Sequence, residues 1–138
     1  MSYQQLLTRY REKHRRLVEP KQGFESLDGS LWLAYSMGRK RGFTDLGTYA
    51  NKPGDHGYYP AFAFDLGRAD RFLFRGWGYL KARRLAKLYW EHHEALHIEY
   101  VILGRKIISR ERPYWHPLTT GDTSHDWHIH VSGHWPGR

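Results

Sequence analysis

Residues 98–109 constrain the fold most, because they have the pattern of a β-hairpin. Residues 98–103 (IEYVIL) and 106–109 (KIIS) are rich in β-branched and aromatic side chains, and Gly104-Arg105 separates them. A Gly-X pair between two such runs is typical of the tight turn that joins antiparallel strands. The chain is therefore expected to contain an antiparallel sheet. Further strands are predicted at residues 43–50, 61–66 and 127–132.

Three segments have apolar residues at helical spacing, namely 2–18, 30–40 and 79–96. Glu19-Pro20 should end the first helix, and Asp28 or Ser30 should cap the second. Helices combined with antiparallel strands predict an α+β fold in which the helices pack on a mostly antiparallel sheet. We expect a single domain over residues 1–138, with residues 1–22 as an N-terminal helical extension.

Composition excludes several classes of site. The chain has no cysteine, which excludes a disulfide framework, a Cys-ligated zinc finger and a thiol nucleophile. Its apolar runs are much shorter than the roughly 20 residues that span a bilayer, so we expect no membrane insertion. The first residues lack the basic-then-apolar order of a secretory signal, so no signal peptide is expected. The net charge of +8 favours a polyanionic partner such as nucleic acid, an acidic membrane or an anionic cell wall.

The ten histidines are clustered, with three in residues 92–97 and five in residues 116–134. Imidazole is a common metal ligand and transfers protons near neutral pH, so clustering indicates chemistry. Residues 93–97 (HEALH) match the H-E-x-x-H zinc motif. A strand-like run begins directly after His97, however, and only Glu111 offers a third ligand at reasonable range. We therefore expect a helix end with a polar face here rather than a zinc site.

A second set of residues is a better candidate for chemistry. His128 and His130 are two apart in a predicted strand, so both imidazoles should project from one face. Asp65 lies in the apolar run 61–66, where a carboxylate is costly to bury unless it is paired or bound to a cation. His56 precedes that run in a glycine-rich turn. The alternatives are exposed histidines on an edge strand and an Asp that caps a turn.

Taken together, these segments supply two histidines and one aspartate, with a further histidine to spare. Three protein ligands with an open fourth position are the arrangement of a catalytic zinc site. An adjacent base, either His128 or Asp126, would accept a proton. Tyr114, Trp115 and Trp127 are candidates for lining a substrate groove, although aromatic side chains are more often part of a core.

The order His, Asp, His-x-His resembles the peptidoglycan metallopeptidases that group with D-Ala-D-Ala carboxypeptidases, lysostaphin-type enzymes and the hedgehog signalling domain. Residues 54–56 (GDH) and 61–66 (AFAFDL) are similar to the zinc-binding turn and strand of that group. Residues 99–114 resemble the hairpin region of its actinobacterial members. Residues 126–132 (DWHIHVS) are similar to the segment that contributes the catalytic histidine and the last ligand, and the resemblance covers about residues 31–133.

The resemblance implies a hedgehog/D-Ala-D-Ala-peptidase-like fold and a zinc-dependent peptidase that hydrolyses amide bonds in peptidoglycan stem peptides. His56, Asp65 and His130 would bind Zn²⁺, and His128, with Asp126, would transfer protons. Many small members of the group are phage lysins. We therefore expect a phage-encoded cytoplasmic protein that is released to the cell wall, or a virion-associated one.

Two features depart from the pattern of that group. Eight residues separate His56 from Asp65, where the group has six. The usual strand arginine is replaced by Phe62, which leaves Lys52 as the candidate substrate-binding cation. The longer spacing leaves open a non-enzymatic virion or adaptor protein with a degenerate metal site. The charge leaves open a basic nucleic-acid-binding protein.

Overall fold

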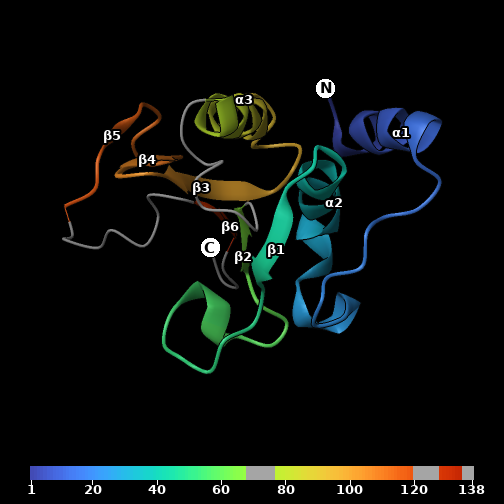
Figure 1. Ribbon diagram of the computed structural model, residues 1–138, viewed down its shortest axis with the longest axis horizontal. Helices are drawn as coiled ribbons and strands as arrows, with labels where there is room; N and C mark the ends of the chain where they lie inside the picture. Colours follow the sequence, from blue (N-terminus) through green and yellow to red (C-terminus); the bar gives the residue numbers. More distant parts are fainter. Residues whose placement is uncertain (68–76, 120–127, 135–138) are drawn as a thin grey trace.

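Helices pack on one face of a six-stranded antiparallel sheet in the computed structural model, which describes residues 1–67, 77–119 and 128–134 (Figure 1). Its helices are α1 (Tyr3–Lys13), α2 (Trp32–Lys40) and α3 (Trp77–Glu91). The strands are β1 (Thr44–Gly47), β2 (Ala63–Gly67), β3 (Ile98–Leu103), β4 (Lys106–Ser109), β5 (His116–Pro117) and β6 (His128–Gly133). Short 3₁₀ helices are η1 (Phe24–Ser26), η2 (Gly29–Leu31) and η3 (Asp55–Gly57). The predicted α+β class is confirmed.

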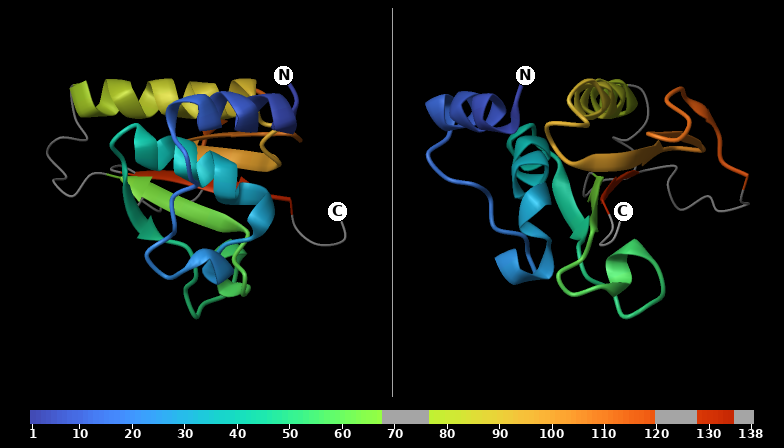
Figure 2. Two further views of the ribbon diagram at one scale, coloured as in Figure 1. Left: turned by 90° about the vertical axis from the view of Figure 1, so that its right-hand side faces the viewer. Right: turned by 180° about the vertical axis from the view of Figure 1, so that it is seen from behind.

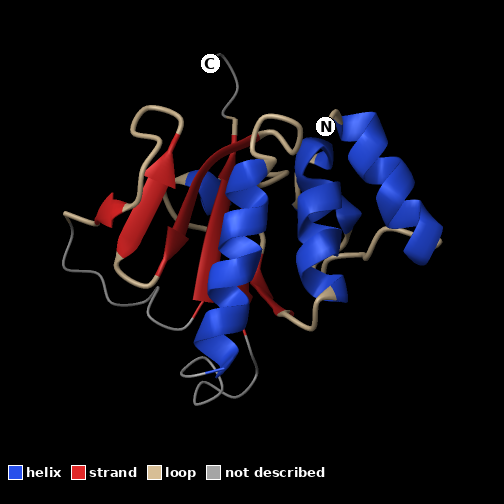
Figure 3. Cartoon of the chain, turned by 90° about the horizontal axis from the view of Figure 1, so that it is seen from above, coloured by secondary structure: helices blue, strands red, loops and turns tan. Residues whose placement is uncertain are grey.

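The sheet has the strand order β1-β2-β6-β3-β4-β5, so the last strand of the chain lies in the middle (Figure 3). β6 pairs antiparallel with both β2 and β3. In this register His130 lies opposite Asp65 on one side and opposite Ile102 on the other. The insertion of β6 thus brings together residues that are far apart in the sequence.

The two faces of the sheet differ because successive side chains along a strand point in opposite directions. Phe64, Leu66 and Val131 are fully buried on the face that α2 and α3 cover. The alternate positions of the same strands include Asp65 and His130, which therefore point to the other face. The loop that contains η3 lies on that second face, opposite the helices (Figures 1 and 2). The polar side chains are thus separated from the hydrophobic core.

The helices are fixed by a well-packed core. The Tyr35 and Phe64 rings meet edge to face at 5.6 Å, and Tyr89 packs on the other side of Phe64 at 6.1 Å. α1 begins with a capping box between Ser2 and Gln5. It adds Leu6 and Tyr10 to the same core, at 7% exposure each.

Several predicted boundaries were wrong. α1 ends at Lys13 rather than near residue 18, and the extended chain that follows is bonded to α2 through the Val18 amide and the Ser36 hydroxyl. α3 ends at Glu91 rather than residue 96. Residues 92–97 form turns, and His97 has a positive φ of 62°. The short strand β5 was not predicted. Within the described residues, no helix is both long and apolar enough to cross a membrane.

The turn at residues 92–97 explains why the H-E-x-x-H match is not a zinc site. Its two histidines do not share one helical face, because the helix has already ended. His93 stacks on Trp90 at 3.9 Å and donates from Nδ1 to the Trp90 carbonyl. The ring of His97 instead packs at 5.5 Å from that of Tyr3. The segment is therefore a series of turns after the helix rather than the expected polar end of the helix itself.

Candidate metal centre

His56, Asp65 and His130 meet on the face of the sheet opposite the helices. Each offers one ligand atom, and these atoms all lie within 4.8 Å of one another. Asp65 and His130 are cross-strand partners on β2 and β6, and His56 reaches them from η3. Among the described residues this is the group that could hold a metal ion.

The donor atoms lie close together, and each histidine faces a different oxygen of Asp65. His56 Nε2 lies 3.3 Å from Asp65 Oδ2 and 3.3 Å from His130 Nδ1, and His130 Nδ1 lies 2.9 Å from Asp65 Oδ1. Metal–ligand bonds of roughly 2.0–2.2 Å at tetrahedral angles place neighbouring ligand atoms about 3.4 Å apart. Two imidazoles and one carboxylate suit divalent transition metals. Both the geometry and the donor chemistry therefore fit a metal ion.

The loop around η3 orients His56. Its Nδ1–H donates to the Thr48 carbonyl at 2.6 Å, which leaves the lone pair of Nε2 directed at the other two ligands. The loop is folded so tightly that a Cβ at position 57 would lie 1.9 Å from the Lys52 carbonyl oxygen. Position 57 therefore requires glycine. The Ala50 amide also donates to the His56 carbonyl at 2.8 Å, and the Phe62 amide donates to the Asp55 carbonyl at 3.0 Å on the other side of the turn.

A second hydrogen-bonded group lies behind His130. Tyr100 and Ser132 both donate to Asp55 Oδ2, the latter at 2.5 Å. His130 Nε2 lies 3.3 Å from the Tyr100 hydroxyl and 3.7 Å from Asp55 Oδ2. This arrangement fixes the imidazole so that its other nitrogen, Nδ1, faces Asp65 and His56. Outer partners of this kind orient metal-binding histidines in proteins.

Charge within the cluster shifts the pKa values of its members. Burial by itself lowers the pKa of His130, but the carboxylates of Asp55 and Asp65 outweigh it and raise that pKa to about 9. Burial raises the pKa of Asp65, yet His130 and His56 outweigh this effect and hold it well below its usual value. The pKa of Asp55 is also lowered, because hydrogen bonds from His130, Ser132 and Tyr100 outweigh its burial. Without a metal, the cluster is therefore a buried ion-pair network.

The other predicted site residues have different locations. His128 is 7% exposed, and its Nε2 lies 3.8 Å from Asp65 Oδ1, at the edge of the cluster. Lys52 is exposed in the loop that precedes η3, and Tyr114 is 55% exposed. Trp115 lines a groove beside α3, on the opposite face of the sheet. Asp126 and Trp127 lie outside the described residues.

Sequence reasoning did not assign a role to Asp55, Tyr100 or Ser132. One signal was available for two of them. Ser132 follows His130 by two residues on one strand, and the register then pairs it with Tyr100 on the same face. That pairing requires knowledge of which strand lies beside β6.

Comparisons of the chain with protein-family models, with curated proteins and with solved structures found no match.

Proposed function

We propose that this protein is a zinc-dependent peptidase that hydrolyses amide bonds in the stem peptides of bacterial peptidoglycan, on a fold of the hedgehog/D-Ala-D-Ala-peptidase type. The observation that supports this proposal most is the donor geometry at His56, Asp65 and His130, with atom pairs 2.9–3.3 Å apart. The order of these residues in the chain agrees with the sequence resemblance described above. Imidazole and carboxylate ligands make zinc the preferred ion.

The chemistry of zinc and the exposure of its three ligands indicate how a substrate would meet the metal centre. A bound zinc ion would polarise a carbonyl oxygen and lower the pKa of water. His56 and His130 are almost completely buried, whereas the side chain of Asp65 is 21% exposed. A substrate would therefore approach the cluster from the side of the carboxylate.

His128 is the proposed general base. Its Nε2 lies 3.8 Å from Asp65 Oδ1, which places it within reach of a proton released beside the cluster. The same nitrogen would then return that proton to the leaving amine. Asp55 and Tyr100 would act indirectly, by holding His130 in its orientation.

Digestion of purified peptidoglycan tests the proposal. The zinc-loaded protein should release fragments whose summed mass exceeds that of the parent by one water for each bond cut, with a new amine and a new carboxyl group at a single type of amide bond. A chelator should stop the release, and added zinc should restore it. His130→Ala should be inactive. The matched control is His116→Ala, since His116 lies on the same sheet face with its Nδ1 bonded to the Tyr114 carbonyl.

Two results would contradict the proposal in different ways. Purified protein that neither contains nor binds zinc would favour the non-enzymatic protein with a degenerate metal site. Protein that binds one zinc ion per chain and leaves peptidoglycan intact would retain the metal centre but exclude this substrate.

A further inference from the structure

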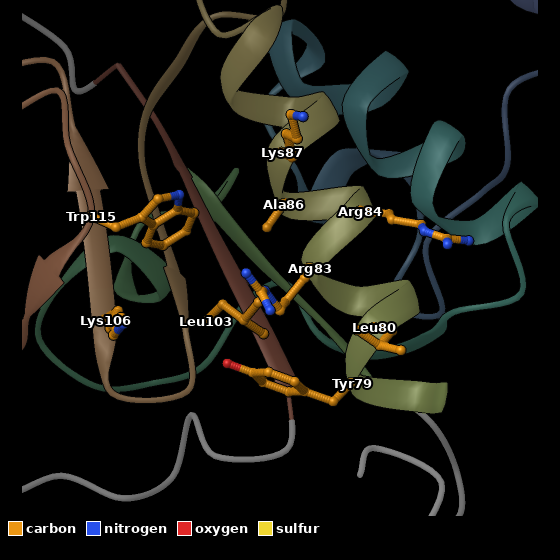
Figure 4. A pocket seen from close by; sticks show the side chains of 9 residues that line it. All are labelled: Tyr79, Leu80, Arg83, Arg84, Ala86, Lys87, Leu103, Lys106 and Trp115. Carbon is orange, nitrogen blue, oxygen red and sulfur yellow. The ribbon is translucent and has the colours of Figure 1, made fainter. Parts of the chain in front are cut away.

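A groove lies between α3 and the outer strands, on the face of the sheet away from the metal centre. It has a volume of about 640 Å³, within the usual range of ligand sites. Leu103 of β3 lies at its base, and the side chains of Tyr79, Arg83, Lys87, Lys106 and Trp115 surround it (Figure 4). Leu103 adjoins Ile102, which is paired with His130, so the two residues point to opposite faces. The sheet therefore separates this groove from the metal centre.

Every charged side chain that lines the groove from the described part of the chain is basic. Arg83 and Lys87 come from α3, and Lys106 comes from β4 on the other side. Figure 4 shows Arg83 extending towards Leu103 and Trp115, whereas Arg84 points away across the helix. Lys87 forms an ion pair with Glu91 at 3.9 Å, and both of these side chains are largely exposed. Among the described residues that line the groove, none is acidic.

Aromatic rings accompany these charges. Trp115 is 38% exposed, although so large an apolar side chain is usually much more buried. Figure 4 shows Tyr79 at one end of the groove and Trp115 on the side opposite α3. An exposed flat ring beside several cations is the combination that binds single strands, because bases stack on the ring and phosphates contact the cations.

We propose that this groove binds single-stranded nucleic acid, with a base stacked on Trp115 and the backbone phosphates beside Arg83, Lys87 and Lys106. A purely anionic polymer without bases would use the basic side chains but would gain nothing from the exposed rings. The basic surface continues past the groove to Arg84, Lys81 and Arg41 on the other side of α3, which gives a longer strand further contacts. This inference does not depend on the proposed peptidase activity.

Fluorescence anisotropy with a labelled oligothymidylate of about ten nucleotides tests the proposal, since this length matches typical single-strand sites. Trp115→Leu should weaken binding about 5- to 160-fold, as expected for the loss of one stacked base. The same variant should bind an abasic oligonucleotide of equal length as the parent protein does. His130→Ala should bind oligothymidylate normally, which separates this test from that of the peptidase.

A charge variant tests the phosphate contacts. Replacing Arg83, Lys87 and Lys106 together by Gln should reduce the slope of log affinity against log salt by about 2, because each phosphate contact on a single strand contributes about 0.7. The matched control replaces Arg11, Arg15 and Arg16 by Gln. It makes the same change in net charge on exposed residues in and after α1, away from the groove. All six positions are exposed, so both variants should fold.

Three results would overturn the proposal. Equal loss of binding in the two charge variants would indicate long-range attraction without a site. Equal affinity of the parent protein for the abasic and the thymidylate oligonucleotide would indicate a general polyanion surface, for example for an anionic wall polymer. Absence of binding at low salt would exclude nucleic acid altogether.

Discussion

His130 is the side chain on which most interactions of the candidate metal centre converge. Its Nδ1 faces Asp65 and His56, and its Nε2 faces Tyr100 and Asp55. A histidine that binds a metal through one nitrogen needs a partner for the other, because that partner fixes the tautomer and the ring orientation. The two sides of this ring thus have separate tasks, and variants can test them separately.

Tyr100→Phe tests the outer side of the ring. The variant keeps the aromatic ring, which is stacked on His130 at 5.5 Å, and removes the hydroxyl that donates to Asp55. We expect zinc affinity to fall about 10- to 100-fold, which is typical for the loss of an outer partner. Competition with a fluorescent chelator measures this. Tyr114→Phe is the control, since Tyr114 is exposed, and equal affinities for all three proteins would show that the hydroxyl of Tyr100 does not position His130.

A pH dependence follows for the metal-free protein. The pKa of His130 is about 9 in the folded state against 6.5 in an unperturbed histidine, because Asp55 and Asp65 outweigh the effect of burial. The resulting stabilisation is complete below about pH 6.5 and is lost as the pH rises through 9. Asp55 and Asp65 have lowered pKa values, so their contribution is lost only in acid, well below this window.

Thermal unfolding in the presence of a chelator should therefore show a Tm that falls between pH 6.5 and pH 9. The free energy of unfolding should decrease by on the order of 3 kcal/mol over this range. His130→Ala should largely remove the decrease. If the variant keeps the full pH dependence, another group must be responsible for it.

At the scale of single residues, the sequence and its resemblance to a known family together predicted all three members of the cluster but not their surroundings. Asp65 was a candidate because a carboxylate in a short apolar strand needs a reason to be buried, and His130 because it shares one strand face with His128. Asp55 and Tyr100 could not be assigned a role, because their role depends on which strands are neighbours. Strand order is a property of the whole sheet and is not encoded by any one local pattern.

At the scale of elements, α2 approaches β2 and α3 most closely at a glycine. A Cβ at Gly38 would lie 2.3 Å from Leu66 Cδ1 on β2 and 2.4 Å from the Tyr89 hydroxyl on α3. That hydroxyl donates to the Ala34 carbonyl at 2.7 Å, so it is not free to move aside. Position 38 therefore sets the distance between α2, the sheet and α3.

Gly38→Ala should destabilise the protein by about 1–3 kcal/mol, because overpacking outweighs the better helix propensity of alanine. Chemical denaturation measures the free energy of unfolding. Gly29→Ala is the control, since the nearest atom to its Cβ would be at 3.9 Å, an ordinary contact. Its effect should stay within about 0.5 kcal/mol. A Gly38→Ala variant as stable as the parent would mean that α2 can shift outwards without cost.

The sequence predicted the existence of most elements better than their ends. The hairpin of β3 and β4 has the predicted bounds, because its turn signal is strong and local. The helical pattern of α3 continues through Leu96, but the chain turns at residues 92–97 so that β3 can begin at Ile98. Tertiary packing overrode propensity there. β5 is too short, at two residues, to produce a recognisable pattern.

At the scale of the whole molecule, the sheet divides two chemically distinct surfaces. The cluster of His56, Asp65 and His130 lies on one side, and the basic groove beside α3 lies on the other. The +8 charge suggested a polyanionic partner from composition alone, but only the fold shows that basic side chains gather around α3. The role of Trp115 in binding a peptidase substrate remains a prediction. Because Trp115 lies in the basic groove, away from the metal centre, its location favours a role in that groove instead.

Metal binding should stabilise the entire fold, because the three ligands join β2, the central strand β6 and the loop around η3. A ligand that binds only the folded state at 100 times its Kd adds about 2.7 kcal/mol. For a chain of this length that corresponds to a rise in Tm of roughly 10 °C. Differential scanning calorimetry with zinc should show this rise, and His130→Ala should not. Mg²⁺ should have little effect, because it prefers oxygen ligands in octahedral geometry. An equal rise in the parent and in His130→Ala would locate zinc binding elsewhere and remove the physical basis for the proposed activity.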